Sequence, residues 1–171
     1  MIPLQKLPPK AIEILQYRLA DEQELFYFYI SAAAWCRLNG YECASKYFIV
    51  ESHGEEYHYK RLSTFLMDWH TEVAYPVLQD PIKTFSGLKE ILEMAYELEY
   101  GLYRRYETNA IEIFPVCQNT HNLMTDFVNV QNDAVICAGR ILNKLKNYLE
   151  VDPTLVQFDK DAFGEYSSVY Y

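Results

Sequence analysis

The 171-residue chain is poor in glycine and has no long apolar run, and both scarcities exclude classes of protein. Six glycines among residues that are 50% hydrophobic are typical of a folded globular chain, not of a disordered or fibrous one. No stretch is apolar enough to span a membrane. The N-terminal MIPLQKLPPK lacks the apolar core and the cleavage site of a secretory signal. The sequence therefore predicts one folded domain with no membrane partner.

Clustered basic residues and paired cysteines are also lacking. The formal net charge is −9, and no Lys/Arg cluster provides the basic face that nucleic-acid binding normally needs. Cys36, Cys43, Cys117 and Cys137 form no C-x-x-C pair, which favours reduced, buried thiols over a disulfide framework or a zinc site. These features predict no nucleic-acid partner and a cytoplasmic location.

Long helical patterns make up most of the chain. Apolar residues recur at spacings of three and four in four segments, which are residues 10–39, 41–70, 86–114 and 118–150. Gly40 is the expected stop of the first helix, and Ser86 is the expected N-cap of the third. The third helix should end before Pro115, and Pro153 should close the fourth. Residues 71–87 contain two prolines and no sustained helical period, so they are predicted to form a long crossover loop.

Two helical hairpins joined by one long connection predict an all-α four-helix bundle. We expect a single domain over residues 1–171, with the bundle at about residues 8–150 and a C-terminal tail at residues 151–171.

Polar residues interrupt the apolar face of every predicted helix. They are Glu22 and Tyr29 in the first, Glu51, Glu55 and His58 in the second, Glu99 in the third and Gln131 in the fourth. Within each predicted hairpin, the polar residues of the two helices lie about the same number of residues from the turn. We therefore expect them at the same depth in the bundle. Burying several carboxylates together is costly, and a bound cation removes that cost. Carboxylates with one imidazole suit iron or manganese better than a metal that prefers thiolates. In the alternative, the glutamates pair internally and no metal is bound.

The ordered set of these motifs resembles the bacterial-type, non-haem ferritins over about residues 10–150. The matching features are Glu22 seven residues before Tyr29, AWC at 34–36, YECA at 41–44, E-x-x-H at 55–58, KRL at 60–62, AYELE ending at Glu99, Gln131, and ILNKL at 141–145. The resemblance implies a ferritin-like four-helix bundle with one long crossover connection and a short C-terminal segment.

The resemblance also implies a di-iron ferroxidase centre. Glu22, Glu55 and His58 would bind one iron, and Glu55 would bridge to a second iron held chiefly by Glu99. Gln131 would sit beside that second site and hydrogen-bond the bound oxygen species or water.

The implied activity is oxidation of Fe(II) by dioxygen or peroxide to a bridged Fe(III) species, followed by storage as mineral. Tyr29 would stand next to the iron pair, able to hydrogen-bond a ligand or supply an electron. The implied assembly is a homo-oligomeric shell of 24 subunits.

Several positions depart from the family pattern. Bacterioferritins and rubrerythrins have a second E-x-x-H in the fourth helix, where this chain has VQND at 130–133. Gly54, Val130 and Ala134 occupy positions where further acids would hold a third iron. The Tyr-rich end of the tail differs from the family's short fifth helix, and Glu51 is either an extra carboxylate ligand or a hydrogen-bond acceptor.

Two other functions fit parts of the pattern. One is a di-iron carboxylate oxidase of the same fold that acts on an organic substrate and stores no iron. The other is a metal-free helical protein whose tyrosines mediate assembly with partners.

Overall fold

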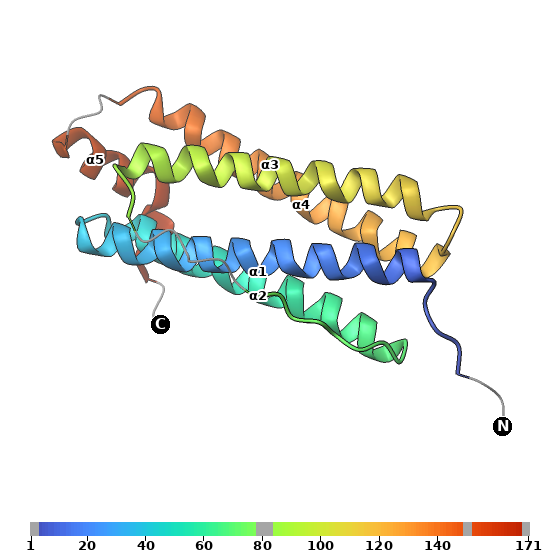
Figure 1. Cartoon of the computed structure of the whole chain (residues 1–171). Helices are drawn as coiled ribbons and strands as arrows, with labels where there is room; N and C mark the ends of the chain where they lie inside the picture. The colour runs from blue at the N-terminus through green and yellow to red at the C-terminus, as the bar shows by residue number, and fades with distance from the viewer. Residues whose placement is uncertain (1–3, 78–83, 149–151, 169–171) are drawn as a thin grey trace.

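The computed structural model describes residues 4–77, 84–148 and 152–168, and the regular elements in these ranges are all helices (Figure 1). They are α1 (Pro9–Leu38), α2 (Glu42–Asp68), α3 (Leu88–Ile113), α4 (Gln118–Leu145), α5 (Asp152–Phe163) and the short 3-10 helix η1 (Gly164–Ser168). The antiparallel pairs α1/α2 and α3/α4 pack against each other, and α5 lies at the end of the bundle where α2 begins (Figure 1). The predicted four-helix bundle is therefore confirmed.

The first hairpin is set by how α1 and α2 end. Gly40 follows α1 with a φ of +84°, and the N–H of Tyr41 donates to the carbonyl of Cys36 at 2.9 Å. This hydrogen bond is typical of helices that end at a residue in the left-handed backbone conformation. Gly40 therefore terminates α1, as the sequence predicted. α2 ends in a similar way at His70, whose φ is +53° and whose N–H donates to the carbonyl of Met67 at 2.9 Å.

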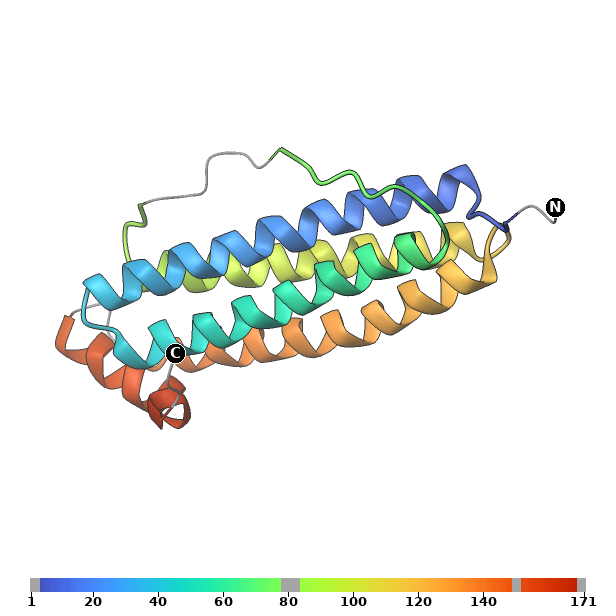
Figure 2. The same ribbon diagram turned by 90° about the horizontal axis from the view of Figure 1, so that it is seen from below.

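The connection between the hairpins turns back along α1 after α2 ends (Figure 2). Gln16 of α1 fixes this path, because its Nε2 donates to the carbonyl of Glu72 at 3.0 Å and its Oε1 accepts from the N–H of Ala74 at 3.2 Å. Residues 78–83 of the predicted crossover lie outside the described residues. The connection carries the chain back along the bundle, so α2 and α3 run parallel (Figure 2).

The start of α3 differs from the prediction by one residue. Gly87 is the N-cap, and Ser86 lies just outside the helix. The Ser86 hydroxyl and N–H both donate to the Glu90 carboxylate, at 2.9 and 2.5 Å. Ser86 therefore donates hydrogen bonds to Glu90, the third residue of α3. A capping serine usually does the opposite and accepts a hydrogen bond from a backbone N–H. α3 ends at Ile113, before Pro115 as expected.

The fourth helix is shorter than predicted. α4 ends at Leu145 rather than near residue 150, and residues 149–151 lie outside the described part of the chain. Pro153 does not close α4 but lies in the first turn of α5, where its missing N–H costs no helical hydrogen bond. The C-terminal segment thus contains a true helix, whereas residues 169–171 of the Tyr-rich end are not among those described.

Asp159 attaches α5 to the start of α2. Tyr41, the N-cap of α2, provides no side-chain cap. The buried Asp159 carboxylate instead accepts from the backbone N–H groups of Ala44 and Cys43, at 2.7 and 3.1 Å. The carboxylate satisfies amides that the helix itself leaves unpaired, and its charge suits the positive end of the helix dipole.

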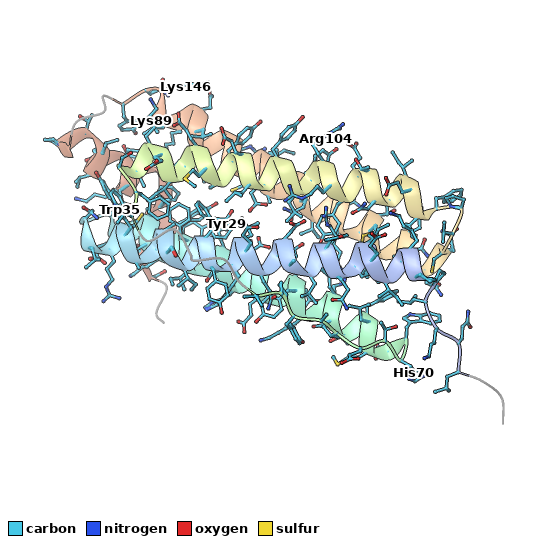
Figure 3. The ribbon with its side chains drawn as sticks, viewed as in Figure 1. Tyr29, Trp35, His70, Lys89, Arg104 and Lys146 are labelled. Carbon is cyan, nitrogen blue, oxygen red and sulfur yellow. The ribbon has the colours of Figure 1, made fainter. Side chains whose placement is uncertain are left out.

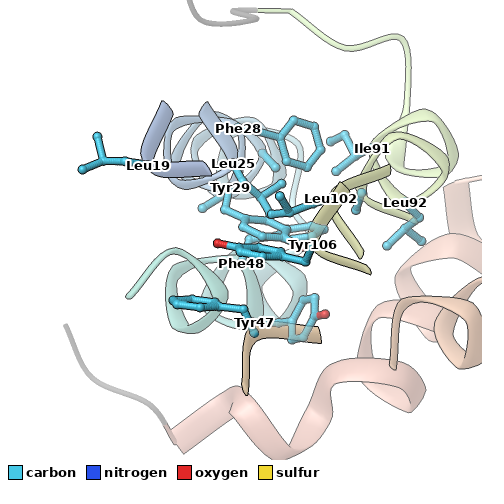
Figure 4. Close-up of a cluster of buried hydrophobic side chains, with 14 of the residues drawn as sticks. Leu19, Leu25, Phe28, Tyr29, Tyr47, Phe48, Ile91, Leu92, Leu102 and Tyr106 are labelled. Atoms are coloured by element: carbon cyan, nitrogen blue, oxygen red, sulfur yellow. The ribbon is translucent and has the colours of Figure 1, made fainter. Parts of the chain in front are cut away.

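The core fills the space between the two hairpins with apolar and aromatic side chains (Figure 4). Fully buried members include Leu15, Leu19, Phe48, Leu62, Leu66, Leu88, Ile91, Phe127, Phe158 and Phe163. Tyr29 stacks on Phe48 with ring centroids 5.8 Å apart, near the middle of this core. The helices are therefore held rigidly around the polar residues that interrupt their apolar faces.

The structure also bears on the predictions about the cysteines and about membrane-spanning segments. All four cysteines are free, as predicted; Cys36 is buried and Cys43 and Cys117 are partly buried against the core, but the prediction of a buried thiol is wrong for the exposed Cys137. Among the described helices, none has the length and apolar character needed to cross a membrane.

Candidate metal centre

Glu22, Glu55 and His58 meet in the interior between α1 and α2. One ligand atom from each lies within 4.8 Å of the others. His58 Nδ1 is 3.0 Å from Glu55 Oε2 and 3.4 Å from Glu22 Oε2. The exposed fractions are 0% for Glu22, 3% for Glu55 and 14% for the His58 side chain. The i, i+3 spacing puts Glu55 and His58 on one face of α2. Glu22 of α1 lies at the same height along the bundle and points towards this face.

The other hairpin contributes Glu99 from α3 and Gln131 from α4, both buried. Gln131 Nε2 donates to Glu99 Oε2 at 2.6 Å, and the Tyr29 hydroxyl of α1 donates to Glu99 Oε1. All four long helices thus place a predicted residue in the interior. Glu99 and Gln131 are not part of the three-residue group described above, so their role as ligands stays a prediction.

Tyr106 is a site residue for which the sequence analysis gave no role. It is fully buried, its hydroxyl donates to Glu22 Oε1, and its ring stacks on Phe127 with centroids 4.8 Å apart. A signal was present, because Tyr106 follows Glu99 by seven residues as Tyr29 follows Glu22. α1 and α3 run antiparallel (Figure 1), so each tyrosine reaches the glutamate of the other helix.

Burial and crowding of acids control protonation at the centre. Burial, then the charge of Glu22, raises the pKa of Glu55 well above its usual value. Burial alone would raise the pKa of Glu22, but the neighbouring His58 imidazole and Glu55 carboxyl outweigh burial and lower the pKa. Burial raises the pKa of Glu99 to about 7 despite the hydrogen bond from Tyr29. Without a cation, crowding of Glu22 and Glu55 disfavours two full negative charges in the interior.

Two oxygens of the centre have no hydrogen-bond partner among the described residues. They are Glu22 Oε2 and Gln131 Oε1, and both are buried. Unpaired buried oxygens are unfavourable, and a cation can satisfy such oxygens without donating a hydrogen. The carboxylates and the imidazole of the three-residue group are a donor set that fits a hard or borderline metal such as iron or manganese.

Glu51 lies one turn before Glu55 but is outside the three-residue group. Burial raises the pKa of its carboxyl to about 7, while the charge of His58 opposes that shift. Its charge also raises the pKa of Tyr47, after the larger effect of burial. Glu51 therefore lies close enough to the centre to interact electrostatically with it, and its role as an extra ligand stays a prediction.

The fold and the centre define a four-helix-bundle protein with a buried group of two carboxylates and one histidine between α1 and α2. Residues 12–148 match the family described as the ferritin-like domain, so the chain belongs to the ferritin-like family.

Curated relatives agree with this assignment. The chain is 25% identical over 148 residues to a probable bacterial non-heme ferritin-like protein of Haemophilus influenzae, covering 84% of this chain and 90% of the relative. It is 22% identical over 141 residues to a bacterial non-heme ferritin of Campylobacter jejuni, covering 82% and 84%. The predicted resemblance to bacterial-type ferritins is confirmed.

Solved structures show the same fold. A humanized archaeal ferritin superposes with a TM-score of 0.87 at 20% identity, over 97% of this chain and 99% of that chain. An open pore ferritin from the archaeon Archaeoglobus fulgidus gives a TM-score of 0.85 at 21% identity, over 92% and 98%.

Proposed function

We propose that this chain oxidises Fe(II) to Fe(III) at the buried centre and stores the iron as mineral inside a homo-oligomeric shell. The observation that carries the proposal is the convergence of Glu22, Glu55 and His58 within 4.8 Å in the protein interior. Membership of the ferritin-like family supports iron as the substrate.

The first iron binds between Glu22, Glu55 and His58, where three ligand atoms already lie together. Binding releases the proton that burial keeps on Glu55, because a bound cation favours the charged carboxylate. The second iron binds towards Glu99, with Glu55 as the bridge and Gln131 beside it. The Glu99 carboxylate accepts hydrogen bonds from Tyr29 and Gln131, which hold it in place across from the first subsite.

The reaction removes one electron from each of two Fe(II) ions. Dioxygen accepts both electrons and two protons and becomes hydrogen peroxide; with peroxide as the oxidant, the products are two water molecules. Anionic ligands favour the ferric state, and the carboxylates keep the two ions close enough to share one oxidant. Tyr29 lies one hydrogen bond from Glu99, where it can orient that carboxylate towards the second iron.

Storage requires a closed assembly, which we propose to be the 24-subunit shell of the family. The formal charge of −9 favours the approach of cations to such a shell. α5 and η1, which are described up to Ser168, lie at one end of the bundle, where they can take part in subunit contacts.

The test is aerobic addition of Fe(II) to the purified full-length protein, followed by absorbance at stopped-flow times. We expect a fast phase that saturates at about two irons per chain, then slower growth of mineral. Glu55→Ala and His58→Ala should slow the fast phase, because each removes a ligand. Glu24→Ala is the matched control, since Glu24 is an exposed acid on α1. Unchanged fast phases in both site variants would refute the assignment.

Two other results identify the competing functions. Oxidation without retained iron supports a di-iron oxidase, and the absence of any iron-dependent signal supports a metal-free interaction protein. Light scattering of the purified protein measures whether a shell of about 24 chains forms.

A further inference from the structure

A small cavity lies beside the bundle between α1 and α3, and none of its lining residues is a proposed ligand of the metal centre. Its volume is about 260 Å³, and its lining residues are Arg18, Arg104, Arg105, Thr108 and Asn109. Three of these five residues are arginines, in a chain that carries a net charge of −9. Arg104 projects from the outer side of α3 (Figure 3). A concentration of positive charge around a concave site is the opposite of what the overall composition favours.

Arg18 is the buried member of this cavity, with an exposed fraction of 8%. Its Nη2 is 2.9 Å from Asp21 Oδ2. Its Nε and Nη1 are buried and have no hydrogen-bond acceptor among the described residues. Buried guanidinium donors without an acceptor are unfavourable, and native structures usually provide an acceptor. Asn109, whose Oδ1 is also buried without a partner, lines the same cavity, and an oxyanion bound there would supply further acceptors to Arg18.

The neighbouring carboxylates do not fill the cavity. Arg105 Nε lies 3.0 Å from Asp21 Oδ2, so Asp21 bridges Arg18 and Arg105 from the side. Arg104 pairs with Glu107 on the helix surface. Neither acid lines the cavity, and its wall carries three arginines and no carboxylate.

We propose that this cavity, which we call the arginine cavity, binds a small inorganic oxyanion of the phosphate class. Guanidinium groups present planar pairs of N–H donors that match the oxygens of phosphate, and partial burial strengthens such charged hydrogen bonds. The inference does not depend on the proposed iron chemistry, because none of the lining residues belongs to the centre.

The test is isothermal titration calorimetry of sodium phosphate into the metal-free, full-length protein at neutral pH and constant ionic strength. We expect one saturable site per chain for the native protein. Arg104→Gln should weaken phosphate binding by about 10-fold or more, because it removes a charged donor from the wall. Arg104 is exposed, so this variant should fold normally, which circular dichroism checks.

A second variant and a control make the result specific. Thr108→Glu keeps every arginine but puts a carboxylate at the exposed Thr108 position, and it should abolish the binding. Arg140→Gln removes one exposed arginine from α4 with the same change in net charge and should leave the affinity within about twofold. Absence of saturable binding, or an equal loss of affinity in Arg104→Gln and Arg140→Gln, would overturn the proposal.

Discussion

The hydrogen bond from Tyr106 to Glu22 allows a quantitative test of how the centre is held together before metal binds. Tyr106→Phe removes one hydroxyl and keeps the ring that stacks on Phe127 at 4.8 Å. Both Tyr106 and Glu22 have an exposed fraction of 0%, so water cannot replace the missing donor. Glu22 Oε2 already lacks a partner among the described residues, and the variant leaves Oε1 without its tyrosine donor.

A hydrogen bond to a charged group contributes about 1.5–3 kcal/mol to stability when its partner would be left buried and unsatisfied. We therefore expect Tyr106→Phe to lower the free energy of unfolding of the metal-free protein by that amount. For a chain of this size, the corresponding fall in melting temperature is about 3–12 °C. The hydrogen bond from Tyr106 also lowers the pKa of Glu22, after the larger effects of burial, His58 and Glu55, so the variant should take up protons more readily.

Guanidinium unfolding followed by circular dichroism measures the difference, with all samples at one protein concentration because oligomers gain stability with concentration. Tyr17→Phe is the control, since Tyr17 lies on α1 with an exposed fraction of 61%. Its effect should be below about 0.5 kcal/mol. If Tyr106→Phe were no more destabilising than Tyr17→Phe, the buried hydroxyl would not support Glu22 and the reasoning would fail.

Three further predictions concern α5, the protonation of Glu51 and the asymmetry of the centre. Asp159→Ala should lower stability by about 1–2 kcal/mol in thermal unfolding, since α2 loses its cap, while Lys160→Ala should change little. Burial raises the pKa of Glu51 from its usual 4.5 to about 7, so the metal-free protein should lose stability as pH rises through this range. Glu51→Gln should remove up to about 3 kcal/mol of that loss, and less because Glu51 is partly exposed. If the urea midpoints of the native protein and of Glu51→Gln differed by the same amount at pH 4.5 and at pH 7, the prediction would be contradicted. Gln131→Glu combined with Ala134→His should tighten binding of a second divalent metal by about 10-fold in calorimetry.

Helix positions in the first hairpin could be predicted closely from the sequence. Gly40 fixes the end of α1 through local backbone geometry, and no distant residue is needed to explain it. The end of α4 could not be predicted in this way, because residues 146–150 continue the helical composition. α4 ends at Leu145, and α5 packs against the start of α2, where Asp159 accepts hydrogen bonds from two backbone amides. That tertiary contact has no local sequence signal.

The convergence of the interior residues followed from periodicity, but the hydrogen bonds among them did not. Periodicity places Glu22, Glu55 and His58 on facing sides of two helices, and the structure brings them together. Whether a buried tyrosine packs passively or donates to a carboxylate depends on the position of one hydroxyl across the helix interface. For this reason no role of Tyr106 could be predicted from the sequence. The arginine cavity could not be predicted either, because it needs side chains from α1 and α3 together.

The two hairpins support the centre almost symmetrically but supply ligands to it unequally. Each of α1 and α3 has a glutamate followed seven residues later by a tyrosine, and each tyrosine donates to the glutamate of the other helix. α2 adds a glutamate and a histidine, whereas the matching positions of α4 are Gln131 and Ala134. Gln131 and Ala134 carry no charge and offer only one ligand oxygen between them. The α4 side of the centre therefore attracts a cation less strongly than the α2 side. The first metal should therefore enter the α1/α2 side, and retention of the second should depend on Glu99, whose carboxylate must exchange its tyrosine and glutamine partners for the metal.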